Sequence, residues 1–143
     1  MLSKIRKYLL SAFTLVVLMS GCRNDANNIP EVLVDIQVNI NNPGYFSLQA
    51  VGGWMYLSGG SRGIIVYRKS SNEFMAWERH CPYQPEDQCA QVSVDSSNVF
   101  AVDFCCGSKF LITDGSVVNG PTTRGLKMYQ TSYDGFAILR IYN

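Results

Sequence analysis

From residue 31 to the C-terminus, hydrophobic residues alternate with polar ones, and turn residues interrupt the alternation at short intervals. In the stretch 34–40, valine and isoleucine occupy every second position, which is typical of a half-buried strand. The Asn-Asn-Pro-Gly sequence at 41–44 then predicts a turn. No segment of useful length has the period of an amphipathic helix, so the sequence predicts an all-β domain, a small sandwich or barrel. Further strands are expected at 54–58, 63–68, 74–79, 90–94, 99–104, 126–131 and 136–142.

The N-terminus has the pattern of a sorting signal. Lys4, Arg6 and Lys7 form a basic region, and the apolar run 8–19 that follows is short for a membrane-spanning helix. The run ends in Ser-Gly directly before Cys22, which resembles the bacterial lipobox. That resemblance implies that Cys22 is lipidated and becomes the mature N-terminus, anchored by acyl chains.

These features predict three segments: a lipoprotein signal peptide at 1–21, a polar, Asn-rich tether at 22–30, and one domain at 31–143. Loss of the three signal cations leaves nine of the twelve Lys and Arg residues against eleven Asp and Glu, a net charge near −2. No basic stripe remains, which argues against a nucleic-acid partner. We expect the bacterial cell envelope as the location, the membrane as a partner through the lipid, and an envelope protein as a further candidate partner.

The last third of the chain carries a recognisable motif, made of Cys106-Gly107-Ser108-Lys109-Phe110, Asp114-Gly115, Gly120-Pro121 and Leu126. Its order and spacing resemble the second half of a Rieske iron–sulfur domain, in which a C-x-C-H-G-S-x-F loop precedes a Gly turn, a Gly-Pro turn and a strand that starts with Leu. The resemblance implies a small Rieske-like β-sandwich or barrel with two cysteine-bearing loops forming a subdomain at one end.

The resemblance also assigns the ligand positions of the family's [2Fe–2S] cluster, in which two cysteines hold one iron and two histidines hold the other. The cysteine positions correspond to Cys81 and Asp103, and the histidine positions to Tyr83 and Cys106. Only Cys81 keeps the family's ligand type. The only histidine of the chain, His80, falls one residue before the first loop motif. This ligand set predicts a domain without the family's cofactor.

Four cysteines remain once Cys22 is lipidated, and an oxidising compartment favours disulfides between them. A bond between the adjacent Cys105 and Cys106 would be strained, so two loop-to-loop connectivities stay open. In some Rieske proteins a disulfide joins the two loops, with its second-loop cysteine just before the histidine ligand. That resemblance implies a Cys89–Cys105 bond and places Cys81 opposite Cys106, so we expect two disulfides in place of the cluster.

The main functional hypothesis is therefore a structural or interaction module stapled by disulfides. The alternative is an electron-transfer protein that binds a [2Fe–2S] cluster through the atypical ligands. A third possibility is a single tetrahedral metal held by Cys81, Cys89 and Cys106 with either Cys105 or His80. The sequence contains no phosphate-binding Gly-rich loop and no Ser/His/Asp set, so a hydrolase is poorly supported.

Overall fold

The computed structural model describes residues 29–143, and the predicted signal peptide, Cys22 and nearly all of the tether lie outside the described residues. Within 29–143, no helix has the length and apolar character that crossing a bilayer requires. The domain is nearly all-β, as the alternation predicts. Its elements are β1 (Asp35–Asn39), the 3-10 helix η1 (Pro43–Leu48), β2 (Trp54–Leu57), β3 (Ile64–Arg68), β4 (Phe74–Glu78), β5 (Val92–Val94), β6 (Phe100–Asp103), β7 (Lys109–Leu111), β8 (Val117–Asn119), β9 (Met128–Tyr133) and β10 (Ile138–Tyr142).

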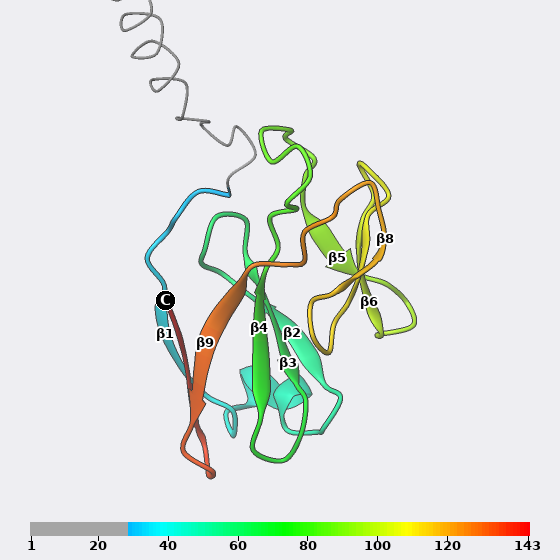
Figure 1. Ribbon diagram of the computed structural model, residues 1–143. Helices are drawn as coiled ribbons and strands as arrows, with labels where there is room; N and C mark the ends of the chain where they lie inside the picture. Colours follow the sequence, from blue (N-terminus) through cyan, green and yellow to red (C-terminus); the bar gives the residue numbers. More distant parts are fainter. Residues whose placement is uncertain (1–28) are drawn as a thin grey trace, which may run out of the picture.

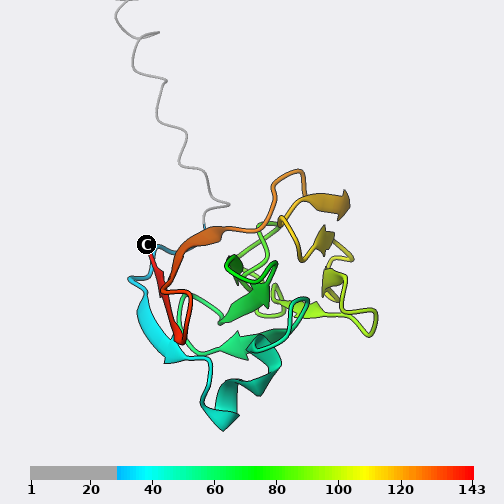
Figure 2. The ribbon, with the colours of Figure 1, turned by 90° about the horizontal axis from the view of Figure 1, so that it is seen from below.

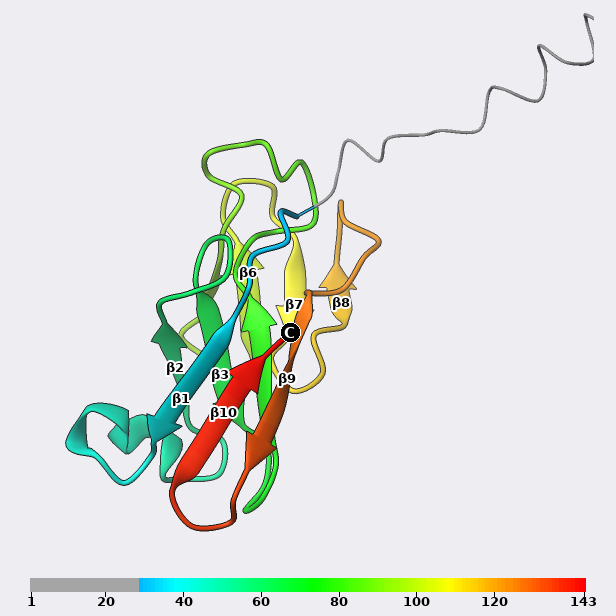
Figure 3. The ribbon, with the colours of Figure 1, turned by 90° about the vertical axis from the view of Figure 1, so that its left-hand side faces the viewer.

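The strands form two antiparallel sheets. The larger has the order β1-β10-β9-β4-β3-β2, and the smaller has the order β5-β6-β7-β8. The first and last strands pair with each other, side by side in Figure 3. The small sheet is inserted between β4 and β9 and lies beside the larger one (Figures 1 and 2). This insertion is the separate subdomain that the Rieske resemblance implies.

Strands β3 and β4 have both faces covered. Their alternate side chains, such as Ile64 and Ala76, enter one core with residues of β1, β9 and β10. The intervening side chains, such as Ile65 and Trp77, enter a second core with residues of the small sheet. These two strands therefore connect the outer sheet to the inserted subdomain.

Trp77 fixes the subdomain on this shared surface. Its indole N–H donates to the carbonyl of Ile112 at 2.8 Å, inside the second core. The Asp114-Gly115 turn lies directly over the indole ring, where a Cβ on Gly115 would clash with the ring at 2.7 Å. Gly115 also has a positive φ of 71°. The motif glycine is thus explained by close packing as well as by backbone conformation.

The buried carboxylate of Glu78 holds the end of β4 against the turn between β2 and β3. It accepts backbone N–H bonds from Ser61, Arg62 and His80 at 2.7, 3.0 and 2.9 Å. The hydroxyl of Tyr129 donates to it at 2.7 Å. Burial and the adjacent carboxylate raise the pKa of Tyr129, so that hydroxyl remains a donor. Four donors therefore satisfy a carboxylate that is fully removed from solvent.

Three elements were not predicted from the sequence: η1, β7 and β8. Strands β7 and β8 have three residues each, which is too short to show alternation. Both lie within the motif, whose residues indicate a loop and turns. The helix η1 begins in the predicted turn and forms from a Pro-Gly start that lacks an apolar period. The predicted all-β class and the cysteine-bearing loops at one end are both present in the structure.

We predict that Glu78→Gln destabilises the domain, because an amide group presents a donor to a site that contains only donors. Charged hydrogen bonds of this kind contribute roughly 1.5–3 kcal/mol, so the free energy of unfolding should fall by about 2–3 kcal/mol in urea denaturation. The matched control is Glu73→Gln, which removes an exposed ion pair with Lys69 and should cost less than about 0.5 kcal/mol. Equal effects of the two substitutions would contradict the role assigned to Glu78.

Candidate functional site

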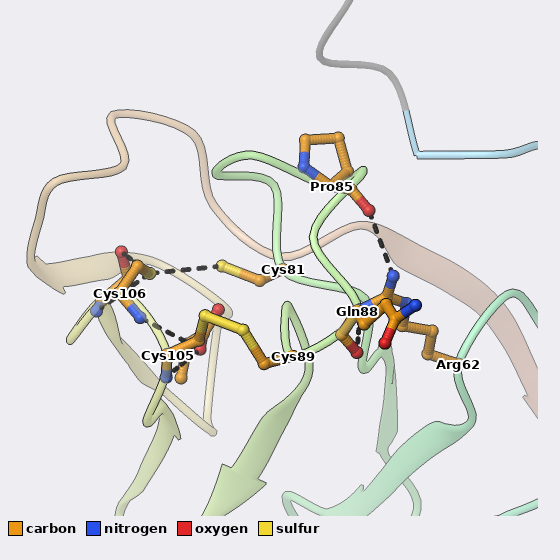
Figure 4. Close-up of a disulfide and its surroundings, with 9 residues drawn as sticks. Arg62, Cys81, Pro85, Gln88, Cys89, Cys105 and Cys106 are labelled. Atoms are coloured by element: carbon orange, nitrogen blue, oxygen red, sulfur yellow. Dashed lines mark hydrogen bonds between the residues drawn. A yellow bond between two sulfur atoms is a disulfide. The ribbon is translucent and has the colours of Figure 1, made fainter.

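Two loops meet at one end of the domain, and a disulfide joins them. The first loop, 81–89, follows β4, and the second, 104–108, connects β6 to β7. Cys89 and Cys105 form the disulfide, with Cα atoms 5.6 Å apart (Figure 4). This is the pairing that the family resemblance implied. Cys81 and Cys106 lie beside it, so all four cysteines of the described chain converge at this end.

Two arginines hold the first loop through its backbone carbonyls. The guanidinium of Arg62 donates to the carbonyls of Gln88 and Pro85 at 3.1 and 3.2 Å (Figure 4). Arg124, which lies between β8 and β9, donates to the carbonyl of Pro82 at 3.1 Å. The loop is therefore fixed on two sides in addition to the disulfide.

His80 supports the same loop and is buried. Its Nε2 lies 2.6 Å from the carbonyl of Pro85, and its Nδ1 lies 2.8 Å from the hydroxyl of Ser61. Because a carbonyl only accepts, Nε2 donates to Pro85, and Nδ1 pairs with the hydroxyl of Ser61, which can either donate or accept. Both nitrogens are thus engaged in hydrogen bonds, which assigns His80 a structural role.

Asp103 organises the second loop from the end of β6. Its Oδ1 accepts from the backbone N–H groups of Cys105 and Cys106 at 2.7 and 3.4 Å, a side-chain cap of the turn. Its backbone carbonyl accepts from the N–H of Gly107 at 2.8 Å. The other carboxylate oxygen, Oδ2, is buried without a hydrogen-bond partner among the described residues. Asp103 therefore shapes the loop with one oxygen and leaves the second available.

Three potential metal-ligating side chains gather where the loops meet. The sulfur atoms of Cys81 and Cys106 are 3.9 Å apart, and these atoms and a carboxylate oxygen of Asp103 all lie within 4.8 Å of one another. Cys81 and Asp103 are fully buried, whereas Cys106 is partly exposed. The thiol of Cys106 also lies 3.1 Å from the hydroxyl of the buried Ser108. The site is a compact cluster of two thiols and one carboxyl group.

Burial is the main reason that the pKa of Cys81 lies well above its ordinary value, and the neighbouring Asp103 raises it further. A backbone hydrogen bond from Tyr83 acts in the opposite direction but does not offset these two effects. Cys81 is therefore a protonated thiol at neutral pH and a weak nucleophile.

The structure differs from two of the expectations. Cys81 and Cys106 are free thiols, so this structure contains one disulfide where two were expected. The tetrahedral set that included Cys89, Cys105 or His80 is not assembled, because the first two are bonded to each other and the histidine faces Ser61 and Pro85. Of the four family ligand positions, three converge, and the fourth, Tyr83, is half-buried against the second core.

Sequence reasoning missed the supporting residues of the site. Glu78 had a usable signal: it shares its position in the alternation with Phe74 and Ala76, so a charged residue falls on a buried face of its strand. No sequence pattern marks Arg62 or Arg124, since each is a single cation in a loop sequence. The contacts described above go to backbone carbonyls, which a sequence pattern does not reveal.

We predict that the paired substitution Cys89→Ala with Cys105→Ala lowers the free energy of unfolding by about 3 kcal/mol. The bond closes a loop of sequence separation 16, and a loop of that size confers stabilisation of that order. The control is Phe104→Ala, next to Cys105 in the second loop, whose side chain is 77% exposed and whose loss should change stability by less than about 0.5 kcal/mol. Denaturant unfolding measures both, and an unchanged midpoint for the paired variant would refute the stapling role.

Comparison with known proteins identifies the fold. No family profile and no curated protein sequence matches the chain. Among solved structures, the crystal structure of the cyanobacterial plasma membrane Rieske protein PetC3 from Synechocystis PCC 6803 matches with a TM-score of 0.55 and 26% sequence identity. The match covers 73% of this chain and 97% of that protein. With the inserted small sheet and the two joined loops, this similarity establishes that residues 29–143 form a Rieske-like domain.

Proposed function

We propose that this chain is an envelope lipoprotein whose Rieske-like domain carries no [2Fe–2S] cluster and serves as a disulfide-stapled structural or interaction module. The observation that carries the proposal is the 3.9 Å separation of the Cys81 and Cys106 sulfur atoms. In the family arrangement, these two positions bind different irons, and terminal ligands on different irons point away from each other. Two sulfur atoms this close to van der Waals contact leave no room for a diiron core between them.

The ligand chemistry supports the same proposal. Rieske clusters owe their raised potential to two neutral imidazoles, and the corresponding positions here are Tyr83 and Cys106. Asp103 stands at a cysteine position and uses one oxygen to cap the second loop. Carboxylate and phenolate oxygens are harder ligands than an iron–sulfur core prefers. The residues present therefore do not fit the family's cofactor.

A structural or interaction role is consistent with how the loops are held. In a Rieske domain the cluster connects the two loops. In this domain the Cys89–Cys105 bond joins the loops, and the Arg62 contacts hold the first of them. The second loop presents Phe104, an exposed aromatic side chain next to the disulfide. An aromatic residue held outward on a rigid loop is suited to contact an envelope protein.

Membrane attachment rests on the Cys22 signal and on the Rieske neighbour, which is described as a plasma membrane protein. The tether predicted at 22–30 leads into the domain at the N-terminal end of β1. The domain is therefore proposed to sit close to the membrane surface outside the cytoplasm.

The cluster-free state predicts a colourless protein. Purified from an oxidising compartment with iron available, it should lack visible absorption and contain neither iron nor acid-labile sulfide in stoichiometric amounts. A Rieske protein with the complete ligand set, produced in the same cells, controls for cluster assembly. The variant that combines Tyr83→His, Asp103→Cys and Cys106→His restores the family ligands and should gain the brown colour. A brown parent protein with two irons and two sulfides per chain would establish the electron-transfer alternative.

The lipid anchor predicts that Cys22→Ala changes the protein's fractionation. The variant should remain unprocessed or leave the membrane fraction, because it lacks the acceptor thiol for the acyl chains. Ser20→Ala, which keeps a small residue before the cysteine, is the control and should fractionate like the parent. If Cys22→Ala is cleaved and membrane-bound as the parent is, the lipoprotein assignment is incorrect.

A further inference from the structure

The cluster of Cys81, Asp103 and Cys106 between the loops is suited to a single metal ion. We propose that Cys81, Asp103 and Cys106 form a mononuclear site for a divalent ion of the zinc type, bound by two thiolates and one carboxylate. The proposal rests on the proposed absence of the family's cluster, because both would occupy the same positions. It assigns a ligand set that differs in composition and nuclearity from a Rieske centre.

The distances match a tetrahedral ion. Zinc–thiolate bonds of about 2.3 Å at a tetrahedral angle place two sulfur atoms roughly 3.8 Å apart. The sulfur atoms of Cys81 and Cys106 are 3.9 Å apart. The Asp103 oxygen is within 4.8 Å of both, so a small movement of the carboxylate brings all three donors within bonding distance of one ion. The separation that is too short for a cluster is thus the separation that one ion requires.

The buried carboxylate gives independent support. Asp103 Oδ1 is held by two backbone N–H groups, whereas Oδ2 is buried and has no hydrogen-bond partner among residues 29–143. A buried carboxylate oxygen without a partner is costly, and a cation beside it removes that cost. In metal sites, a carboxylate that binds the ion through one oxygen is usually oriented by hydrogen bonds to its other oxygen.

The thiol of Cys106 is also flanked by groups that can orient it as a ligand. Ser108 lies 3.1 Å from its sulfur through the hydroxyl, and the Ser108 backbone N–H lies 3.5 Å from the same atom. Once Cys106 binds as a thiolate, both groups of Ser108 can donate to it. Ser108 itself is buried and also accepts from the backbone N–H of Thr122 at 3.3 Å, which fixes its orientation.

Binding is an exchange of protons for a cation. The ion forms bonds to the two sulfur atoms and to the Asp103 oxygen, and the two thiol protons pass to solvent, with no change of oxidation state. Three protein ligands leave the fourth tetrahedral position for water or an external ligand. Because Cys106 is partly exposed, that position is open to solvent on the side of the second loop.

Cobalt(II) titration of the purified full chain in detergent, under anaerobic conditions, tests the site directly. We expect one Co²⁺ per chain, with sulfur-to-cobalt charge-transfer bands and the visible bands of a tetrahedral ion, and displacement by one equivalent of Zn²⁺. Bound ion should also protect Cys81 and Cys106 from alkylation while the Cys89–Cys105 bond stays intact.

Two variants and a control identify the ligands. Asp103→Asn keeps an acceptor for the loop N–H groups but removes the anionic ligand, and should weaken Co²⁺ binding at least about tenfold. Cys106→Ser should remove much of the charge-transfer intensity. Asp114→Asn is the control, since Asp114 caps an exposed turn in the same way and lies outside the proposed site, and it should bind like the parent.

Three results would overturn the proposal: no saturable 1:1 binding, unchanged affinity in Asp103→Asn, or a Cys81–Cys106 disulfide in protein purified without oxidants. Each of them leaves the cluster-free domain standing. Two irons with two acid-labile sulfides per chain would overturn both the mononuclear site and the proposed function. The metal and sulfide contents therefore separate failure of the inference from failure of the function on which it rests.

Discussion

The covalent bond between Cys89 and Cys105 is the constraint on which the tip of this domain depends. It holds two loops that come from different parts of the chain, one after β4 and one between β6 and β7. Arginine contacts to loop carbonyls and the His80–Pro85 hydrogen bond complete the support of the first loop. With the loops fixed in this way, the sulfur atoms of Cys81 and Cys106 lie 3.9 Å apart. The substituted ligand positions therefore leave the Rieske-like arrangement of the two loops in place.

The substitutions at the ligand positions are mutually consistent. Asp103 replaces a ligand and at the same time caps the loop that carries Cys106. Cys106 replaces an imidazole with a shorter side chain, which lies close to Cys81. The result is a close cluster of two sulfur atoms and one carboxyl group. Both the proposed absence of a diiron cluster and the proposed single-ion site rest on these atoms.

Much of the fold was predictable because period-two alternation and the Gly-Ser-x-Phe motif are both visible within short stretches of sequence. The motif also located the converging cysteines and the bond between Cys89 and Cys105. The free state of Cys81 and Cys106 was not predictable, since the sequence shows that two thiols meet but not the distance between them. The role of Asp103 in the loop was not predictable either. Its position in the motif implied a metal ligand, whereas its Oδ1 accepts a hydrogen bond from the backbone N–H of Cys105. Contacts to backbone carbonyls, as made by Arg62, leave no sequence pattern.

Anomalous X-ray diffraction from crystals of the mature protein tests whether the two loops hold an iron–sulfur cluster. Data collected on both sides of the iron absorption edge locate iron atoms within the structure without relying on colour or on bulk analysis. For a domain without a cluster, we expect no iron peak between Cys81, Tyr83, Asp103 and Cys106, and sulfur atoms of Cys81 and Cys106 that remain in near contact. Two adjacent iron peaks between the loops, with those sulfur atoms spread apart, would show that the cluster is present.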